Sequence, residues 1–238
     1  MAKAHAEWRV LPHEPIEKLA ENLWFVRGSL PKMSLKRTMV VARQADGRLV
    51  IHNGIALGPV AQAELEAWGT PTTLIVPSGI HRLDAPAYKA RYPQLRVLTP
   101  RGARKKVEEV VAVDGTYEDA VLDDAIRFEM LHGVGDQEGA MIVRSADGLT
   151  VVLNDAMFNM ERPKDLLGNA ITAMLGSAPG PRVSRLAKLA LVKDKKALRA
   201  DLERYAALPQ LVRVIVAHDK VASGPAARNA LLAAAAYL

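Results

Sequence analysis

The chain has 238 residues, of which half are hydrophobic and 24% are charged, with 32 Lys and Arg against 26 Asp and Glu. This composition predicts a globular protein with a sizeable core rather than a disordered chain. The net charge of +6 makes the chain basic, but the excess of basic over acidic residues is smaller than in a dedicated nucleic-acid-binding arm. Because the sequence has no cysteine, it excludes disulfides, thiolate metal sites and a cysteine nucleophile.

Membrane insertion and secretion are not expected from this sequence. It has no run of about 18 apolar residues, the length that a membrane-spanning helix needs. Its first residues lack the apolar core of a signal peptide. We therefore expect a cytoplasmic protein without a membrane partner. No shift in composition divides the chain, which predicts a single domain over residues 1–238.

Two segments, 39–53 and 141–155, resemble each other. Each contains an apolar β-branched run, an Asp-Gly pair and a second apolar run. The pairs Asp46-Gly47 and Asp147-Gly148 suit tight turns, so each segment predicts a β-hairpin. Similarity over fifteen residues can arise by chance, but the elements that follow each hairpin also match in kind. This favours an internal duplication.

The rest of the chain predicts alternating helices and strands. In chain order we expect a helix over 59–69, a strand over 72–76, a helix over 85–92, strands over 95–98 and 126–131, helices over 163–174, 183–191 and 195–208, a strand over 211–216 and a helix over 225–238. Asp194 is the expected N-cap of the helix 195–208, and the Gly- and Pro-rich stretch 169–182 is a candidate loop or lid. The alternation predicts an α/β fold with two sheets face to face and helices outside.

Four polar residues follow apolar strands and are candidates for chemistry. His81 follows the strand 72–76, Asp136 follows the strand 126–131, Asp155 ends the second hairpin, and His218 follows the strand 211–216. Ligands gather at strand ends, and imidazole and carboxylate groups bind divalent metals. Taken singly, each residue is equally typical of a surface turn or a cap. The four together favour a site.

In the order of these segments, the chain resembles the metallo-β-lactamase-like hydrolase superfamily over most of its length. The pair Asn154-Asp155 resembles that family's strand ending in Gly-Asp, and Ala217-His218 resembles its strand ending in Gly-His. Residues 134–139 resemble its Pro-Gly-His-Thr-like turn, with Asp136 at the ligand position. Of the first signature, His-x-His-x-Asp-His, at most His81 and Asp84 remain. The resemblance implies an αββα four-layer sandwich of two mixed sheets flanked by helices, with a hydrolytic metal site between the sheets.

One branch of this superfamily, with no firmly assigned reaction, is similar at three further places. In that branch a Pro-Asn/Ser-x-x-His-like sequence replaces the first signature, as in Pro77 to His81 here. A Tyr-Pro pair follows, at Tyr92-Pro93, and the residues after the first hairpin, 53–57, also match. The branch implies the fold without implying a substrate.

The resemblance implies His81, Asp136, Asp155 and His218 as metal ligands, with Asp155 and His218 as the catalytic pair. The cofactor is then one divalent ion (zinc, manganese or iron), or none if the eroded first signature leaves the site degenerate. Glu138 or Asp219 would support the ligands or carry a proton.

Three functions follow from these features. The first is a metal-dependent hydrolase of an ester, thioester or phosphoester. The second is a catalytically impaired protein of the same fold that binds a small molecule, its carboxylates paired with Arg or Lys; the missing first cluster favours it. The third is a nucleic-acid binder, from the basic runs 101–106 and 182–199. Only eleven aromatic residues occur and none interleave with these runs, so we expect solvated surface and no nucleic-acid partner. The sequence indicates no particular oligomeric state.

Overall fold

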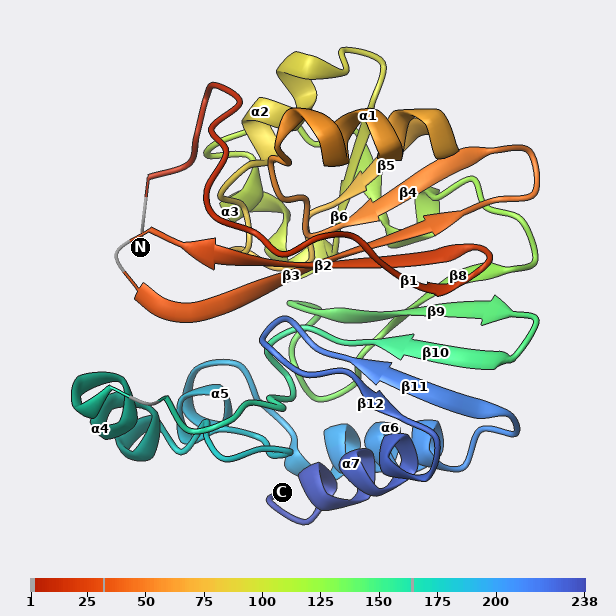
Figure 1. Ribbon diagram of the computed structural model, residues 1–238. Coiled ribbons are helices and arrows are strands. Elements are labelled where there is room, and N and C mark those ends of the chain that lie inside the picture. The colour runs from red at the N-terminus through yellow and green to blue at the C-terminus, as the bar shows by residue number, and fades with distance from the viewer. Residues whose placement is uncertain (1–2, 32, 164) are drawn as a thin grey trace.

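Two β-sheets pack face to face, and helices cover the outer face of each sheet (Figure 1). The computed structural model describes residues 3–31, 33–163 and 165–238. Its layers are the helices around α1 (Pro59–Trp68) and α2 (Ala85–Arg91), the two sheets, and the helices α6 (Lys195–Ala206) and α7 (Pro225–Ala235) (Figure 1). This confirms the predicted α/β sandwich of two mixed sheets with helices outside.

Within the described residues, the first sheet has seven strands in sequence order. They are β1 (Glu17–Ala20), β2 (Leu23–Leu30), β3 (Met33–Arg43), β4 (Arg48–His52), β5 (Thr70–Ile75), β6 (Arg96–Thr99) and β7 (Gly115–Thr116). Neighbours from β1 to β4 are antiparallel, and neighbours from β4 to β7 are parallel. The helices of this half are α1 (Pro59–Trp68), α2 (Ala85–Arg91) and α3 (Arg104–Val107).

The second sheet, as far as the chain is described, has five strands in the order β12-β11-β10-β9-β8. Their bounds are β8 (Ile126–Met130), β9 (Gly139–Ser145), β10 (Gly148–Val152), β11 (Leu211–Ile215) and β12 (Ala222–Ser223). The helices of this half are α4 (Leu166–Leu175), α5 (Arg185–Ala190), α6 (Lys195–Ala206) and α7 (Pro225–Ala235). None of the helices in the described part of the chain combines the length and apolarity that a bilayer crossing needs.

Both predicted hairpins form, one in each sheet. β3 pairs antiparallel with β4, and β9 pairs antiparallel with β10. Gly47 and Gly148 adopt φ values of 86° and 139°, which is why glycine follows the aspartate at each turn. The second strand of each hairpin then pairs in parallel with the next strand, β4 with β5 and β10 with β11. The two halves thus share one order of elements.

Apolar side chains of both sheets meet in a shared central core. Buried members include Phe25 and Val40 from the first sheet, and Met141 and Ile215 from the second. Separate apolar clusters join each sheet to its own helices. Because strand side chains alternate between the two faces, one apolar strand contributes to both the central and an outer cluster.

The structure differs from the sequence predictions at the predicted loop or lid. The stretch 169–182 is only partly a loop, because its first residues belong to α4, which ends at Leu175 and is followed by the C-cap Gly176 with a φ of 61°. The predicted start of that helix includes residue 164, which lies outside the described residues.

Candidate metal centre

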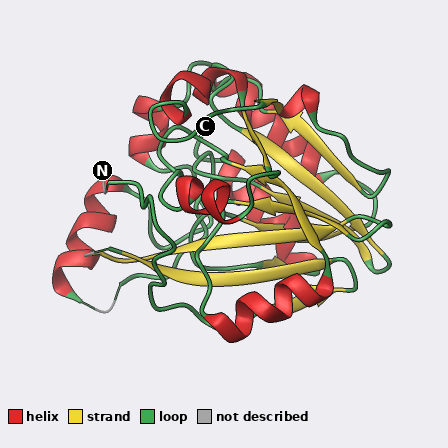
Figure 2. Ribbon diagram, turned by 90° about the horizontal axis from the view of Figure 1, so that it is seen from above, coloured by secondary structure: helices red, strands yellow, loops and turns green. Residues whose placement is uncertain are grey.

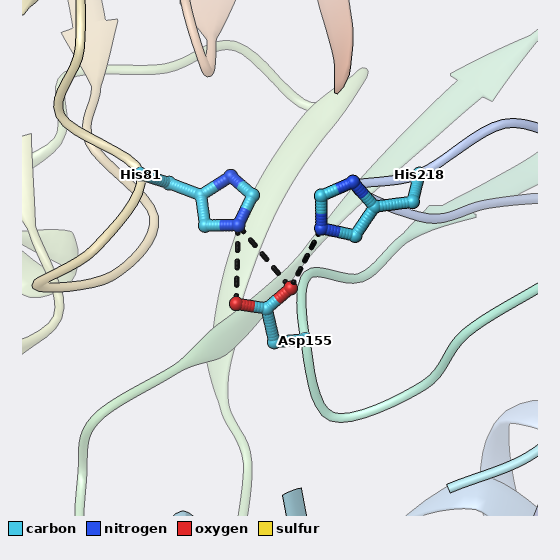
Figure 3. A group of neighbouring side chains, drawn as sticks. All are labelled: His81, Asp155 and His218. Atoms are coloured by element: carbon cyan, nitrogen blue, oxygen red, sulfur yellow. Dashed lines mark hydrogen bonds and ion pairs between the residues drawn. The ribbon is translucent and has the colours of Figure 1, made fainter. Parts of the chain in front are cut away.

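Three of the four candidate ligands come together, from segments 63 residues or more apart (Figure 3). The His81 Nε2 atom lies 3.2 Å from Oδ1 and 3.1 Å from Oδ2 of Asp155. The His218 Nε2 atom lies 3.3 Å from the same Oδ1. One nitrogen or oxygen atom from each side chain falls within 4.8 Å of the others, so a single ion can reach all three.

The strands explain this convergence. Asp155 follows β10 and His218 follows β11, which are parallel neighbours with Val152 opposite Ile215. Parallel strands end at the same edge of a sheet, so their following residues emerge together. His81 follows β5 of the first sheet. The group therefore lies where the two sheets meet.

The three side chains are largely buried, with exposed fractions of 10% for His81, 12% for Asp155 and 6% for His218. Burial alone raises the pKa of Asp155, but the positive charge of His81 and hydrogen bonds from both rings outweigh burial and hold this pKa well below its usual range. Burial also lowers the pKa of His218, but the hydrogen bond from its ring to Asp155 and the carboxylate charge outweigh it and raise this pKa. The carboxylate is therefore ionised.

Contacts behind the ring set the orientation of His218. Its Nδ1 atom lies 2.6 Å from the Lys36 carbonyl oxygen, to which it donates. The Phe158 ring stacks against the imidazole, with centroids 5.5 Å apart and an interplanar angle of 11°. Nε2 is consequently the ring nitrogen that faces Asp155 (Figure 3).

Glu138 holds the turn that carries Asp155. Its buried carboxylate accepts hydrogen bonds from the Ala156 amide at 2.8 Å, the Asp155 amide at 3.2 Å and the Asn154 side-chain nitrogen at 3.1 Å. Burial and the nearby charge of Asp155 raise the pKa of Glu138 to about 8. Glu138, which the sequence suggested as a support for the ligands, therefore contacts the backbone that carries Asp155 rather than the ligand side chains. Asp219, the other residue considered for support, accepts from the Glu161 amide at 3.2 Å.

The structure does not bring Asp136, the fourth candidate ligand, to this group. Asp136 lies in a turn after β8 with a φ of 58°, and its carbonyl oxygen accepts from the Gly102 amide at 2.9 Å. Its half-exposed carboxylate pairs with Arg101 at 3.4 Å. The turn therefore holds Asp136 against the segment after β6, and the expected four-ligand set becomes three.

Asp84, the other remnant of the first signature, forms ion pairs that join separate segments of the chain. Its buried carboxylate pairs with Arg37 at 2.6 Å and with His5 at 2.7 Å. It also accepts from the Ala56 amide at 3.0 Å. These contacts join the N-terminal segment, β3 and the loop after β4, away from the His81 ring.

His52 is a nearby histidine that was not among the candidates. It ends β4, is 2% exposed, and its Nε2 atom has no hydrogen-bond partner among the described residues. Burial, together with the charge of His81, lowers the pKa of His52 to about 3. The sequence signal was present, because His52 also ends an apolar strand.

Comparisons with known proteins bear on the fold. Neither protein-family models nor curated proteins give a match to this sequence. Among solved structures, the DIM-1 metallo-β-lactamase exposed to ceftazidime is similar, with a TM-score of 0.64 and 12% identity over 96% of this chain and 99% of that chain. The metallo-β-lactamase of Erythrobacter litoralis, with β-mercaptoethanol in its active site, has a TM-score of 0.61 and 13% identity over 94% and 96%.

Both similarities extend over nearly the full length of each protein, so they concern the whole architecture rather than one motif. The architecture includes the two mixed sheets, the outer helices and the order of elements. Identity at this level carries the fold and no particular chemistry. The chain has the metallo-β-lactamase fold.

Proposed function

We propose that this chain is a hydrolase of a small ester, thioester or phosphoester, with one divalent ion held by His81, Asp155 and His218. The observation that carries the proposal is the convergence of two imidazole nitrogens on one ionised carboxylate. An ion held there supplies a Lewis acid and an activated water molecule at neutral pH. Zinc, manganese and iron all accept this combination of nitrogen and oxygen ligands.

The separations between the three side chains support a shared ion. Ligand bonds of about 2.0–2.2 Å, at the angles of tetrahedral or octahedral sites, place neighbouring ligand atoms roughly 3–3.5 Å apart. The nitrogen-to-oxygen distances here are 3.1–3.3 Å. Three protein ligands also leave positions for water and substrate, as a catalytic site requires.

The tautomer of His218 gives a second argument. Because Nδ1 donates to the Lys36 carbonyl, a neutral His218 ring presents the lone pair of Nε2 to the Asp155 carboxylate. Two acceptors facing each other at 3.3 Å repel unless a cation lies between them. Either a proton or a metal ion removes this repulsion. The same arrangement of His218 and Asp155 therefore raises the pKa of His218 and favours a bound metal ion.

Within this proposal each side chain has a defined task. Asp155 stays ionised and contributes the charge that attracts the ion. Lys36 and Phe158 hold the ring of His218 so that Nε2 points at the site. Glu138 fixes the backbone at Asp155, so the carboxylate keeps its place without moving on binding.

The metal-free alternative predicts carboxylates paired with Arg or Lys. Asp84 and Asp136 follow that pattern, with Arg37 and Arg101 as partners. Asp155 does not: among the described residues, its side chain contacts two histidines. The contrast within one protein supports a metal role for Asp155 in particular.

Elemental analysis of protein purified without chelators tests the proposal. We expect about one divalent ion per chain in the wild type, and loss of the ion and of hydrolysis of p-nitrophenyl esters or phosphodiesters in the Asp155→Ala/His218→Ala variant. Asp136→Ala removes a carboxylate outside the group and is the matched control, which keeps both. A wild type that stays free of metal after incubation with zinc, manganese and iron overturns the proposal. Retention of the ion by the double variant overturns the ligand assignment.

A further inference from the structure

Of the twelve exposed large apolar side chains in the described part of the chain, five lie within residues 162–193. Leu166, Ile171 and Met174 of α4 are exposed by 89%, 43% and 67%. Leu186 and Leu189 of α5 are exposed by 51% and 84%. Exposed aliphatic side chains gathered in one short segment indicate a surface that is covered in function. We name residues 162–193 the arm.

The arm also concentrates the positive charge of the chain. It contains six basic residues (Arg162, Lys164, Arg182, Arg185, Lys188 and Lys193) and one acidic residue, Asp165, for a net charge of +5. The whole chain carries +6. The acidic residues that balance the following basic helix begin at Asp194, after the arm. Nearly all of the net charge therefore lies in the same segment as the exposed apolar groups.

The first part of the arm, with α4, projects from the sandwich, and its base is attached near the candidate metal centre. Both ribbon views place α4 at the left edge of the molecule, apart from α6 and α7 (Figures 1 and 2). Phe158 and Arg182 exchange backbone hydrogen bonds of 2.8 Å, which close the base of this excursion. Phe158 is the residue that stacks on His218. The base of the arm thus lies beside the three-residue group.

Within the arm, apolar and basic side chains alternate on α5. Leu186 and Leu189 are three residues apart, and so are Arg185 and Lys188, which gives two adjacent columns on the helix. Arg185 donates to the Met174 carbonyl at 3.4 Å, so the end of α4 and the start of α5 are in contact. The Lys188 amine also donates to the carbonyl of Tyr237, a 43% exposed aromatic residue near the end of α7.

We propose that the arm docks on the surface of a membrane that contains anionic phospholipids. Helices with exposed aliphatic and basic side chains bind the headgroup region, where the former enter the acyl boundary and the latter attract anionic lipids. This contact needs no spanning segment. It places the candidate metal centre close to the bilayer surface, because the base of the arm adjoins His218.

Two other occupants fit less well. A second copy of this chain in a symmetric contact brings two arms of charge +5 together, which repel each other. A nucleic acid uses the basic groups but not the aliphatic ones, and the arm contains no aromatic residue on which bases stack. An anionic membrane uses both kinds of side chain.

Co-sedimentation of the full chain with vesicles tests the proposal. We compare vesicles of equal parts phosphatidylcholine and phosphatidylglycerol with vesicles of phosphatidylcholine alone. The expected result is binding to the anionic vesicles that falls severalfold or more as NaCl rises from about 0.05 to about 0.5 M. Leu166→Ser/Leu189→Ser and Arg185→Glu/Lys188→Glu each lower the binding about tenfold or more.

The controls separate the arm from general charge and from the metal centre. Arg9→Glu/Lys105→Glu changes the net charge by the same amount at exposed positions in the other half, and keeps most of the binding. Asp155→Asn binds vesicles like the wild type, because docking does not depend on the metal ligands. Absence of binding to anionic vesicles overturns the proposal, and so does equal loss in the Arg9→Glu/Lys105→Glu control. Sedimentation velocity tests the other occupant. If the wild type is a dimer and Leu166→Ser/Leu189→Ser is a monomer, the arm binds a second copy of this chain instead of a membrane.

Discussion

Three aspartates of this protein show how the partner decides the role of a carboxylate. Asp84 meets Arg37, Asp136 meets Arg101, and Asp155 meets two histidines. In the sequence all three follow apolar runs and carry the same chemical group. The strand-end pattern therefore found Asp155, and it also proposed Asp136, whose turn leads the side chain elsewhere.

Glu138→Gln probes the support of the metal group. Above its raised pKa of about 8, Glu138 is ionised and both of its oxygens accept backbone N–H groups, so an amide must place its NH2 against one of these donors. We expect a loss of about 1–3 kcal/mol in the free energy of unfolding. We also expect metal affinity about 10–100-fold weaker, because the turn that holds Asp155 loses its anchor.

Urea denaturation and metal titration at a pH above the raised pKa of Glu138 measure the two effects of Glu138→Gln. Glu108→Gln, at an exposed position on the surface, is the control, for which we expect a change within about 0.5 kcal/mol and an unchanged affinity. Normal metal affinity in a destabilised Glu138→Gln protein contradicts the anchoring role.

The buried ring of His52 predicts a pH dependence of stability. The pKa of His52 is lowered from 6.5 to about 3 in the folded chain by burial and by the charge of His81. Above pH 6.5 the ring is neutral in both states and contributes no difference. Below pH 6.5 only the unfolded chain protonates His52. The free energy of unfolding therefore decreases by about 1.4 kcal/mol for each unit that the pH is lowered, until the pKa of His52 in the folded chain is reached.

The measurement compares urea denaturation of the wild type and of His52→Gln at pH 7 and pH 5. Other titrating groups affect both proteins alike, so the difference between them reports His52. We expect the wild type to lose about 2 kcal/mol more than the variant over this interval. Parallel losses in the two proteins show that the folded chain protonates His52 at an ordinary pKa.

Among the elements, helix and strand positions followed from local patterns. Pro59 begins α1 and Gly69 follows it, as the sequence predicts. Asp194 caps α6 by accepting from the Lys196 and Ala197 amides at 2.9 and 3.1 Å. Such signals act within one turn of the chain, so the ends of a helix can be predicted from the sequence without knowledge of the fold. The arm was harder to predict, because the exposure of its apolar side chains depends on what packs against them.

Asp194→Ala tests the cap of α6. The substitution removes the acceptor of two amide hydrogen bonds, and we expect a loss of about 1 kcal/mol in the free energy of unfolding. Asp194→Asn keeps a side-chain oxygen and is expected to retain most of the stability. Chemical denaturation at neutral pH distinguishes the two variants. An equal loss in both indicates that the negative charge near the helix start matters more than the hydrogen bonds.

At the scale of the whole molecule, the two halves depend on a shared core. Phe25 and Val40 of the first sheet pack with Met141 and Ile215 of the second. Two hairpins followed by alternating elements predicted facing sheets, and the structure confirms this arrangement. The short strands β7 and β12 were not predicted, since two-residue strands have no periodicity and exist only through pairing with β6 and β11.

The sequence by itself determined the class of fold and most element positions, and it proposed four ligands at strand ends, because apolar periodicity, turn residues and strand ends are local properties. Only the tertiary structure decided that His81, Asp155 and His218 meet, that Asp136 does not, and that His52 lies buried beside them. Those outcomes depend on how the two sheets stack and where turns direct side chains. Such distances join residues far apart in the chain, and local pattern carries no information about them.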